Sequence, residues 1–227
     1  MWRRQPRAVR VAAILCGVAL GLLALAQILL PRIAAGRIRS RVERYGHVDS
    51  VSVSAWPAVK LLWGDADTVH VDASNIALSP KQAASLLWEG RGVAHLDLHA
   101  DAVHVGSLAL TDATLEKHGS QLAAEASTTQ AATQAALPEG LEVKLLGSRD
   151  GEVEVEATGG IFGLQATVDA VALAEGGQLI AHPLGLLVEG FKLKLFSDPH
   201  VYVEGIGATA PAGQPSQYRL SMQAGLR

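Results

Sequence analysis

From residue 48 onward, apolar and polar residues alternate along about ten short segments, among them HVDSVSVSA, VAHLDLHADAVHV and GEVEVEAT. Successive side chains of a β-strand point to opposite faces, so this alternation predicts strands that bury one face and expose the other. Turn signals separate the segments, including Asp150-Gly151 and Gly176-Gly177. The pattern predicts a large, mainly antiparallel sheet rather than a succession of β-α-β units.

Two helical segments interrupt the strands. SPKQAASLLWEG offers Ser79 as an N-cap and Pro80 in the first turn, and both favour the start of a helix. STTQAATQAALPEG has Ser127 and Gln130 at capping-box spacing and ends before Pro138. The predicted fold class is therefore α+β.

Composition excludes two classes of function. The chain has 227 residues, of which 49% are apolar, and a net charge of -3, so it can bury a sizeable core in one large domain or two small ones. No nucleic-acid partner is expected, because the chain has no excess of basic residues to neutralise phosphates. Its single cysteine, Cys16, excludes an intramolecular disulfide.

The N-terminal segment predicts membrane insertion. Residues 11–30 form an apolar run whose only clearly polar member is Gln27. At ~1.5 Å per residue this run makes about 30 Å of helix, enough to cross a bilayer. Four arginines precede it: Arg3, Arg4, Arg7 and Arg10. By the positive-inside rule they stay in the cytoplasm, which predicts a single-pass protein of the cytoplasmic membrane with its domain on the extracytoplasmic side.

A cleaved signal peptide is the alternative, because ALA at residues 24–26 is an acceptable signal-peptidase site and would place cleavage after Ala26. Both alternatives export residues 31–227. The domains expected are a signal anchor or signal peptide, a juxtamembrane basic amphipathic helix, a β-rich domain and a C-terminal strand or tail. These cover residues 1–30, 31–46, 47–210 and 211–227, respectively.

The juxtamembrane segment is rich in arginine. It begins at Pro31 and ends at Gly46, and its apolar residues recur at spacings that give an amphipathic helix with a basic face. The helix is either a solvated stalk or lies against anionic headgroups, where each arginine contributes about 1 kcal/mol. Arg37 and Arg41 are the predicted headgroup contacts.

Two of the four tryptophans flank one turn in AWPAVKLLWG, residues 55–64, which we call the hook. Pro57 stops the preceding strand from continuing, and the apolar residues that follow are too few for an independent core helix. Tryptophan beside lysine is typical of a water–lipid interface, so the hook is either a membrane contact or a plug that closes one end of the sheet. The predicted lipid and membrane contacts are Trp56, Pro57, Val59, Lys60, Leu61, Leu62, Trp63 and Trp88.

The best enzyme candidate is HLDLHAD. It sets His95, Asp97, His99 and Asp101 on one face of a strand, and His70 and Asp72 alternate in the same way nearby. Side chains two apart on a strand lie ~6.6 Å apart, close enough to share a metal with a third ligand from a neighbouring strand. Such alternation is also typical of a solvent-facing strand. No serine lies in a nucleophile elbow, so no catalytic residue, metal or cofactor is predicted.

The order of these elements resembles a known family. LPRIAAGRIRSRVERYG, VSVSAWPAVKLLWG and ADTVHVDASNIALS follow one another, and GGQLIAHPLGLLVEGFKLKLF comes late in the chain. This order resembles the LmeA-like phospholipid-binding proteins over most of residues 28–206. The resemblance implies phospholipid binding in the cell envelope and a part in making mannan-type glycans. It also implies one lobe of a tubular lipid-binding fold, a strongly curved, mainly antiparallel sheet wrapped around a long helix.

These observations predict an exported, membrane-anchored protein that binds phospholipid and is not an enzyme. The expected partners are a phospholipid, an anionic membrane surface and envelope glycan-synthesis proteins. A scaffold domain of an envelope complex, with a filled core, is the first alternative. A metal-dependent hydrolase that uses His95, His99 and a carboxylate is the second. The lipid and its fate, transfer or sensing, stay open.

Overall fold

The computed structural model describes residues 7–137, 139–149, 151–161, 164–184, 192–211 and 216–227. Over these residues the helices are α1 (Arg7–Val42), α2 (Pro80–Glu89) and α3 (Gln130–Ala135), with two short 3-10 helices, η1 (Ala58–Trp63) and η2 (Gly90–Gly92). The strands are β1 (Gly46–Ser54), β2 (Ala66–Leu78), β3 (Val93–Val105), β4 (Leu108–His118), β5 (Gln121–Thr129), β6 (Leu141–Arg149), β7 (Glu152–Ile161), β8 (Leu164–Glu175), β9 (Gln178–Pro183), β10 (Leu193–Phe196), β11 (Val201–Thr209) and β12 (Gln217–Leu226).

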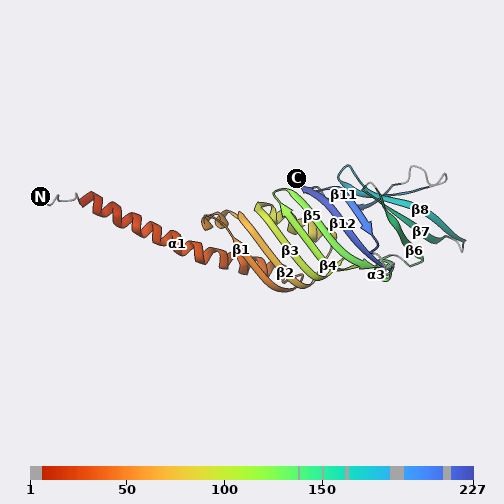
Figure 1. Cartoon of the computed structure of the whole chain (residues 1–227), viewed down its shortest axis with the longest axis horizontal. Helices are drawn as coiled ribbons and strands as arrows, with labels where there is room; N and C mark the ends of the chain where they lie inside the picture. The colour runs from red at the N-terminus through yellow and green to blue at the C-terminus, as the bar shows by residue number, and fades with distance from the viewer. Residues whose placement is uncertain (1–6, 138, 150, 162–163, 185–191, 212–215) are drawn as a thin grey trace.

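The strands form two sheets that follow one another along the long axis of the molecule (Figure 1). The first has seven strands in the order β1-β2-β3-β4-β5-β12-β11, and the second has five in the order β10-β9-β8-β7-β6. The prediction of an α+β fold with mainly antiparallel strands is confirmed. Residues 211–227, predicted as a strand or tail, supply β12, which pairs with both β5 and β11 inside the first sheet.

One pair of neighbouring strands departs from the antiparallel prediction. β2 and β3 run parallel and are joined by α2, so they form one β-α-β unit. Alternation along the chain does not reveal strand direction, because any strand with one buried face alternates in the same way. α2 begins as predicted, with Ser79 and Gln82 in a capping box. α3 is capped by Thr129 instead of Ser127, because Ser127 still belongs to β5.

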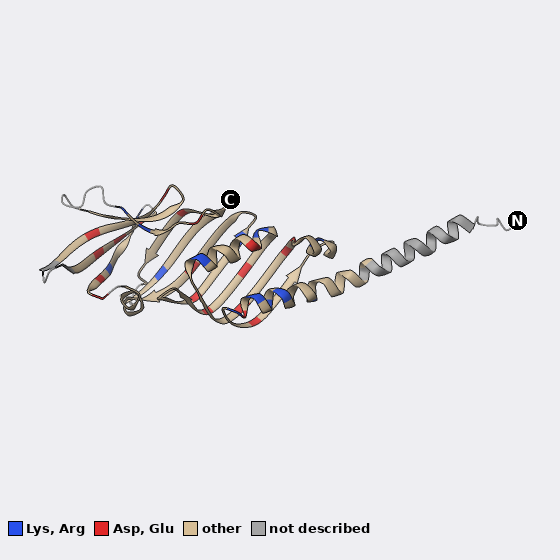
Figure 2. Ribbon diagram, turned by 180° about the vertical axis from the view of Figure 1, so that it is seen from behind, with Lys and Arg blue, Asp and Glu red and all other residues tan. Residues whose placement is uncertain are grey.

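Irregular pairing curves the first sheet. The register shifts between β1 and β2 and again between β4 and β5, where Asp112 adopts a positive φ of 49°. Such bulges bend a strand and increase its twist, and aspartate tolerates the left-handed conformation better than most residues. α2 and the C-terminal turns of α1 lie across the concave face that results (Figure 2).

α1 is one helix from Arg7 to Val42, with Pro31 inside it, so the two helices predicted before and after residue 30 are continuous. Only its C-terminal turns contact the sheet, where Ile38 and Val42 pack against the cluster of Val48, Ala66, Val69 and Val71. Its N-terminal part projects away from both sheets (Figure 1). The sheet therefore curves over the end of a long helix, and the wrapping that the resemblance implied is limited to these turns.

The membrane segment predicted at residues 11–30 lies mostly outside the described side chains, which begin at Leu23. Among the residues that could be searched, no helix is long and apolar enough to cross a membrane.

Lys117 is the most deeply buried charged residue among those described. Its side chain is 1% exposed, and its ammonium donates hydrogen bonds to the carbonyl oxygens of Arg91 and Val93. Burial lowers the pKa of Lys117 below its usual value of 10.5, because the charged form loses hydration. The folded chain therefore binds this proton less tightly than the unfolded chain.

We predict that Lys117→Met changes how stability depends on pH. Between the lowered pKa and 10.5 the unfolded chain binds more protons, so this lysine makes the wild type more stable as the pH rises toward 10.5. The effect amounts to about 1.4 kcal/mol for each unit by which the pKa is lowered. The Tm of the wild type minus the Tm of Lys117→Met should therefore increase with pH, measured in detergent. Lys144→Met, at an exposed position, should show a constant difference, and a constant difference for Lys117→Met too would contradict the prediction.

Candidate functional site

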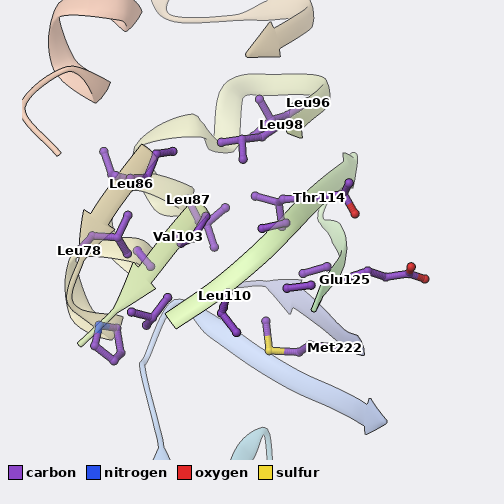
Figure 3. A pocket seen from close by; sticks show the side chains of 18 of the residues that line it. Leu78, Leu86, Leu87, Leu96, Leu98, Val103, Leu110, Thr114, Glu125 and Met222 are labelled. Atoms are coloured by element: carbon purple, nitrogen blue, oxygen red, sulfur yellow. The ribbon is translucent and has the colours of Figure 1, made fainter. Parts of the chain in front are cut away.

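A continuous groove of about 1760 Å³ runs along the concave face of both sheets. It begins at the C-terminal turns of α1, passes under α2 and reaches β6 to β10 of the second sheet. Most of the side chains that line it are apolar, as the close view of Leu78, Leu96, Leu98 and Leu110 shows (Figure 3). Because pockets for drug-sized ligands measure roughly 300–1,000 Å³, this groove fits a larger apolar ligand.

Alternation along each strand decides which residues face the groove. On β5, Ala124 and Ala126 line it, whereas Ala123 is exposed on the opposite face. The Glu125 carboxylate points away from the apolar side chains (Figure 3). Small residues leave the groove open because they cannot fill it. Among those that line it are Ala113, Ala124, Ala126, Ala172, Gly207 and Ala208.

Small residues of LQATVDAVALA, residues 164–174, and the glycines near Phe162 would keep the groove open where they line it. Ala172 of this segment does line it, whereas Gly159 does not. Phe162 and Gly163 lie outside the described residues.

Arginines of α1 form a basic rim at the first end of the groove. Both predicted headgroup residues, Arg37 and Arg41, line it, together with Arg44. Arg41 forms an ion pair with Glu89 of α2, which the sequence did not reveal because the two residues are far apart in the chain. Arg37 is exposed and makes no ion pair with any residue that the structure describes. Arg37 is therefore the better placed of the two to bind an anion.

The hook lies beside this rim and exposes its largest side chains. Trp56, Leu62 and Trp63 are 70%, 66% and 73% exposed, whereas Ala58 is buried and Leu61 lines the groove. A plug would bury its aromatic rings, so the plug interpretation fits Leu61 and Ala58 but not the tryptophans. Trp88 lies elsewhere, with its ring 4.4 Å from that of His200 and beneath the guanidinium of Arg91.

Asp67 holds the base of the hook. Its carboxylate accepts hydrogen bonds from the Lys60 ammonium and from the Trp56 backbone N–H, both at 2.6 Å. These donors, Lys60 first, lower the pKa of the Asp67 carboxyl. Lys60 was predicted to contact lipid headgroups, and in the structure its ammonium is paired with Asp67 at the base of the hook.

The histidine–aspartate alternation lies on the other face of the first sheet. His70 lies opposite Asp97 on the neighbouring strand, and Asp72 lies opposite His99. The two histidines are exposed and the two aspartates are half-buried. His99 lies 3.5 Å from Asp101 and His70 lies 3.2 Å from Asp72. Among the described residues no three His, Cys, Asp or Glu side chains are placed to hold a metal ion, so the hydrolase alternative finds no centre there.

A curved, mainly antiparallel fold around a long apolar groove with a basic rim defines a lipid-binding class of protein. The comparison with protein families agrees, because the model for LmeA-like phospholipid-binding proteins matches residues 22–212. The chain belongs to this family. No curated protein and no solved structure matches it.

We predict that Ala126→Trp reduces lipid binding by filling the groove. If the indole excludes three methylenes at ~0.8 kcal/mol each, affinity should fall roughly 50-fold. Titration of the full-length chain with a fluorescent fatty-acyl probe measures this. Ala123→Trp, on the opposite face of the same strand, is the matched control and should bind like the wild type. Equal affinities for all three chains would place the ligand outside the groove.

Proposed function

We propose that the protein holds a phospholipid with its acyl chains in the groove and its headgroup at the basic rim. The observation that carries this proposal is the long, unfilled apolar groove in a member of a phospholipid-binding family. Each CH₂ moved from water into such a groove contributes ~0.8 kcal/mol, so a long acyl chain is bound strongly without any specific polar contact.

The two ends of the groove differ in a way that supports this orientation of the lipid. Arg37, Arg41 and Arg44 gather at the α1 end, where a phosphate can accept charge-assisted hydrogen bonds. Farther along, Val143, Leu145 and other apolar residues of the second sheet line the groove. A phospholipid that enters acyl chains first satisfies both environments.

The cellular setting forms part of the proposal. An apolar run at residues 11–30 after an arginine cluster favours a single-pass anchor in the cytoplasmic membrane, with the domain on the extracytoplasmic side. The exposed tryptophans of the hook then contact the lipid–water interface. The family resemblance favours a supporting role in envelope lipid or mannan-type glycan synthesis, with glycan-synthesis proteins as partners.

The groove also favours a lipid-binding protein over the scaffold alternative. A scaffold domain was expected to have a filled core, whereas about 1760 Å³ along the concave face is empty. Unfilled apolar surface costs stability, so a fold keeps it where a ligand fills it. We therefore favour a non-enzymatic lipid-binding role.

We predict that Trp63→Asp weakens membrane contact while the chain stays folded. Withdrawing a large apolar side chain from the interface costs roughly 1.5–3 kcal/mol, which corresponds to about 10- to 100-fold in affinity. Native mass spectrometry of the full-length chain from detergent should show a bound phospholipid in the wild type and much less in Trp63→Asp. Leu146→Asp replaces a comparably apolar, exposed residue of the second sheet and should retain the lipid. A wild type that carries no bound lipid would contradict the proposal and favour the scaffold function.

We also predict that Arg37→Glu reduces the preference for anionic lipid. Reversing one charge at the rim removes an attraction of about 1 kcal/mol and adds a repulsion of similar size, so affinity should fall roughly 30-fold. The measurement is competition between anionic and zwitterionic phospholipids for the purified chain at low and high salt. Arg149→Glu, at the end of β6, controls for the change in net charge. If the basic rim has no role in binding, Arg37→Glu and Arg149→Glu should show the same preference for anionic lipid.

A further inference from the structure

Gln27 joins the long helix to the hook. It is the one clearly polar residue of the apolar run, and its side-chain amide is partly buried between α1 and the hook. Its Nε2 donates a hydrogen bond to the Ala55 carbonyl at 2.9 Å, and its Oε1 accepts one from the Ala58 N–H at 2.8 Å. The amide thus binds the hook backbone on both sides of Trp56 and Pro57, using a donor and an acceptor at once.

Exposed apolar side chains surround this contact. Five are on α1 and three on the hook, which makes eight of the twelve large apolar residues that are exposed in the described part of the chain. We call these eight the collar: Leu23, Leu25, Ile28, Leu29, Ile33, Trp56, Leu62 and Trp63. A contiguous apolar patch of this kind marks a protein or membrane contact.

The charges next to the collar select a membrane as its occupant. Along α1, arginines begin beside the last collar residue, Ile33, and continue toward the end of the helix: Arg32, Arg37, Arg39, Arg41 and Arg44. Apolar side chains followed by basic ones match the order of hydrocarbon and headgroups in an anionic leaflet. Four of the five α1 residues of the collar belong to the apolar run of residues 11–30.

The position of Gln27 along α1 relates the collar to the groove. Ile33, the first α1 residue that lines the groove, lies six positions further on, which is about 9 Å at ~1.5 Å per residue. The headgroup layer on each side of a bilayer is roughly 5–8 Å thick. With Gln27 at the edge of the hydrocarbon, the groove opens at the outer boundary of the headgroup layer.

We propose that Gln27 is a positioning residue that fixes the hook to the membrane helix, so that the mouth of the groove rests on the leaflet holding the chain. The acyl chains of a phospholipid then have a short path from the leaflet into the groove. The inference rests on the proposed function, because it concerns how lipid reaches the same groove. Replacing Gln27 by an apolar residue frees the hook and alters the groove only at its mouth, where Leu61 and Gly64 line it.

The test uses the full-length chain with Trp2→Phe and Trp88→Phe, so that only the hook tryptophans report. It is reconstituted into anionic vesicles that contain phosphatidylcholine brominated at defined depths. Interfacial bromine should quench Trp56 and Trp63 strongly. In Gln27→Leu this quenching should weaken, because the loss of two hydrogen bonds shifts the attachment of the hook by about 30-fold. Gln121→Leu, at an exposed position on β5, should behave like the parent chain.

Lipid delivery separates this inference from the proposed function. Gln27→Leu should slow the movement of a labelled phospholipid from donor to acceptor vesicles by about tenfold, because the hook is attached to α1 in fewer molecules. Its affinity for a monomeric short-chain phospholipid in solution should stay within about twofold, since the rest of the groove is intact. If delivery and quenching are both unchanged, Gln27 has no positioning role. If the parent chain does not bind the monomer, the proposed function itself fails.

A second variant covers failure to fold. Should Gln27→Leu lose its circular dichroism signal, Asp67→Asn loosens the hook from its other side and leaves α1 unaltered. It should reduce quenching and delivery without changing monomer affinity. Unchanged quenching and delivery in Asp67→Asn would overturn the proposal.

Discussion

The concave face of the two sheets carries apolar side chains that the described helices cover only in part. An apolar sheet face is stable when another layer packs on it. Here α2 and the last turns of α1 cover part of the first sheet, and residues such as Ala124 and Ala126 are too small to close the remaining space. The proposed phospholipid would supply the missing apolar layer while leaving its polar end outside.

The basic rim and the hook lie at the end of the groove where α1 meets the sheet. Arg37 offers an unpaired charge, whereas Glu89 and Asp67 already neutralise Arg41 and Lys60 among the described residues. Pairing lowers the attraction for anions but fixes the geometry of the rim and of the hook. Among the described residues this leaves Arg37 as the charge of the rim that is best placed to meet an anionic headgroup.

Sequence reasoning located features that depend on local patterns. Alternation and turn residues predicted the strands, and Ser79 predicted the start of α2, because these signals act within a few residues. The sequence located the hook but left open whether its tryptophans are exposed or form a plug. Contacts between distant segments were not predicted, since nothing local encodes them. The parallel pairing of β2 with β3, the ion pair from Arg41 to Glu89, and the packing of Trp88 on His200 are of this kind.

The junction between the sheets explains why the groove is long enough for acyl chains. The Val203 N–H of β11 donates to the Gly177 carbonyl in the β8–β9 turn at 3.0 Å, which attaches the second sheet to the edge of the first. Gly177 has a φ of +83°, and a Cβ there would lie 2.1 Å from the Tyr202 ring, so only glycine fits. A larger residue at position 177 would force the turn away from Tyr202 and disturb this contact between the sheets. The contact keeps Val143, Val153 and the other groove-lining residues of the second sheet in line with the first sheet.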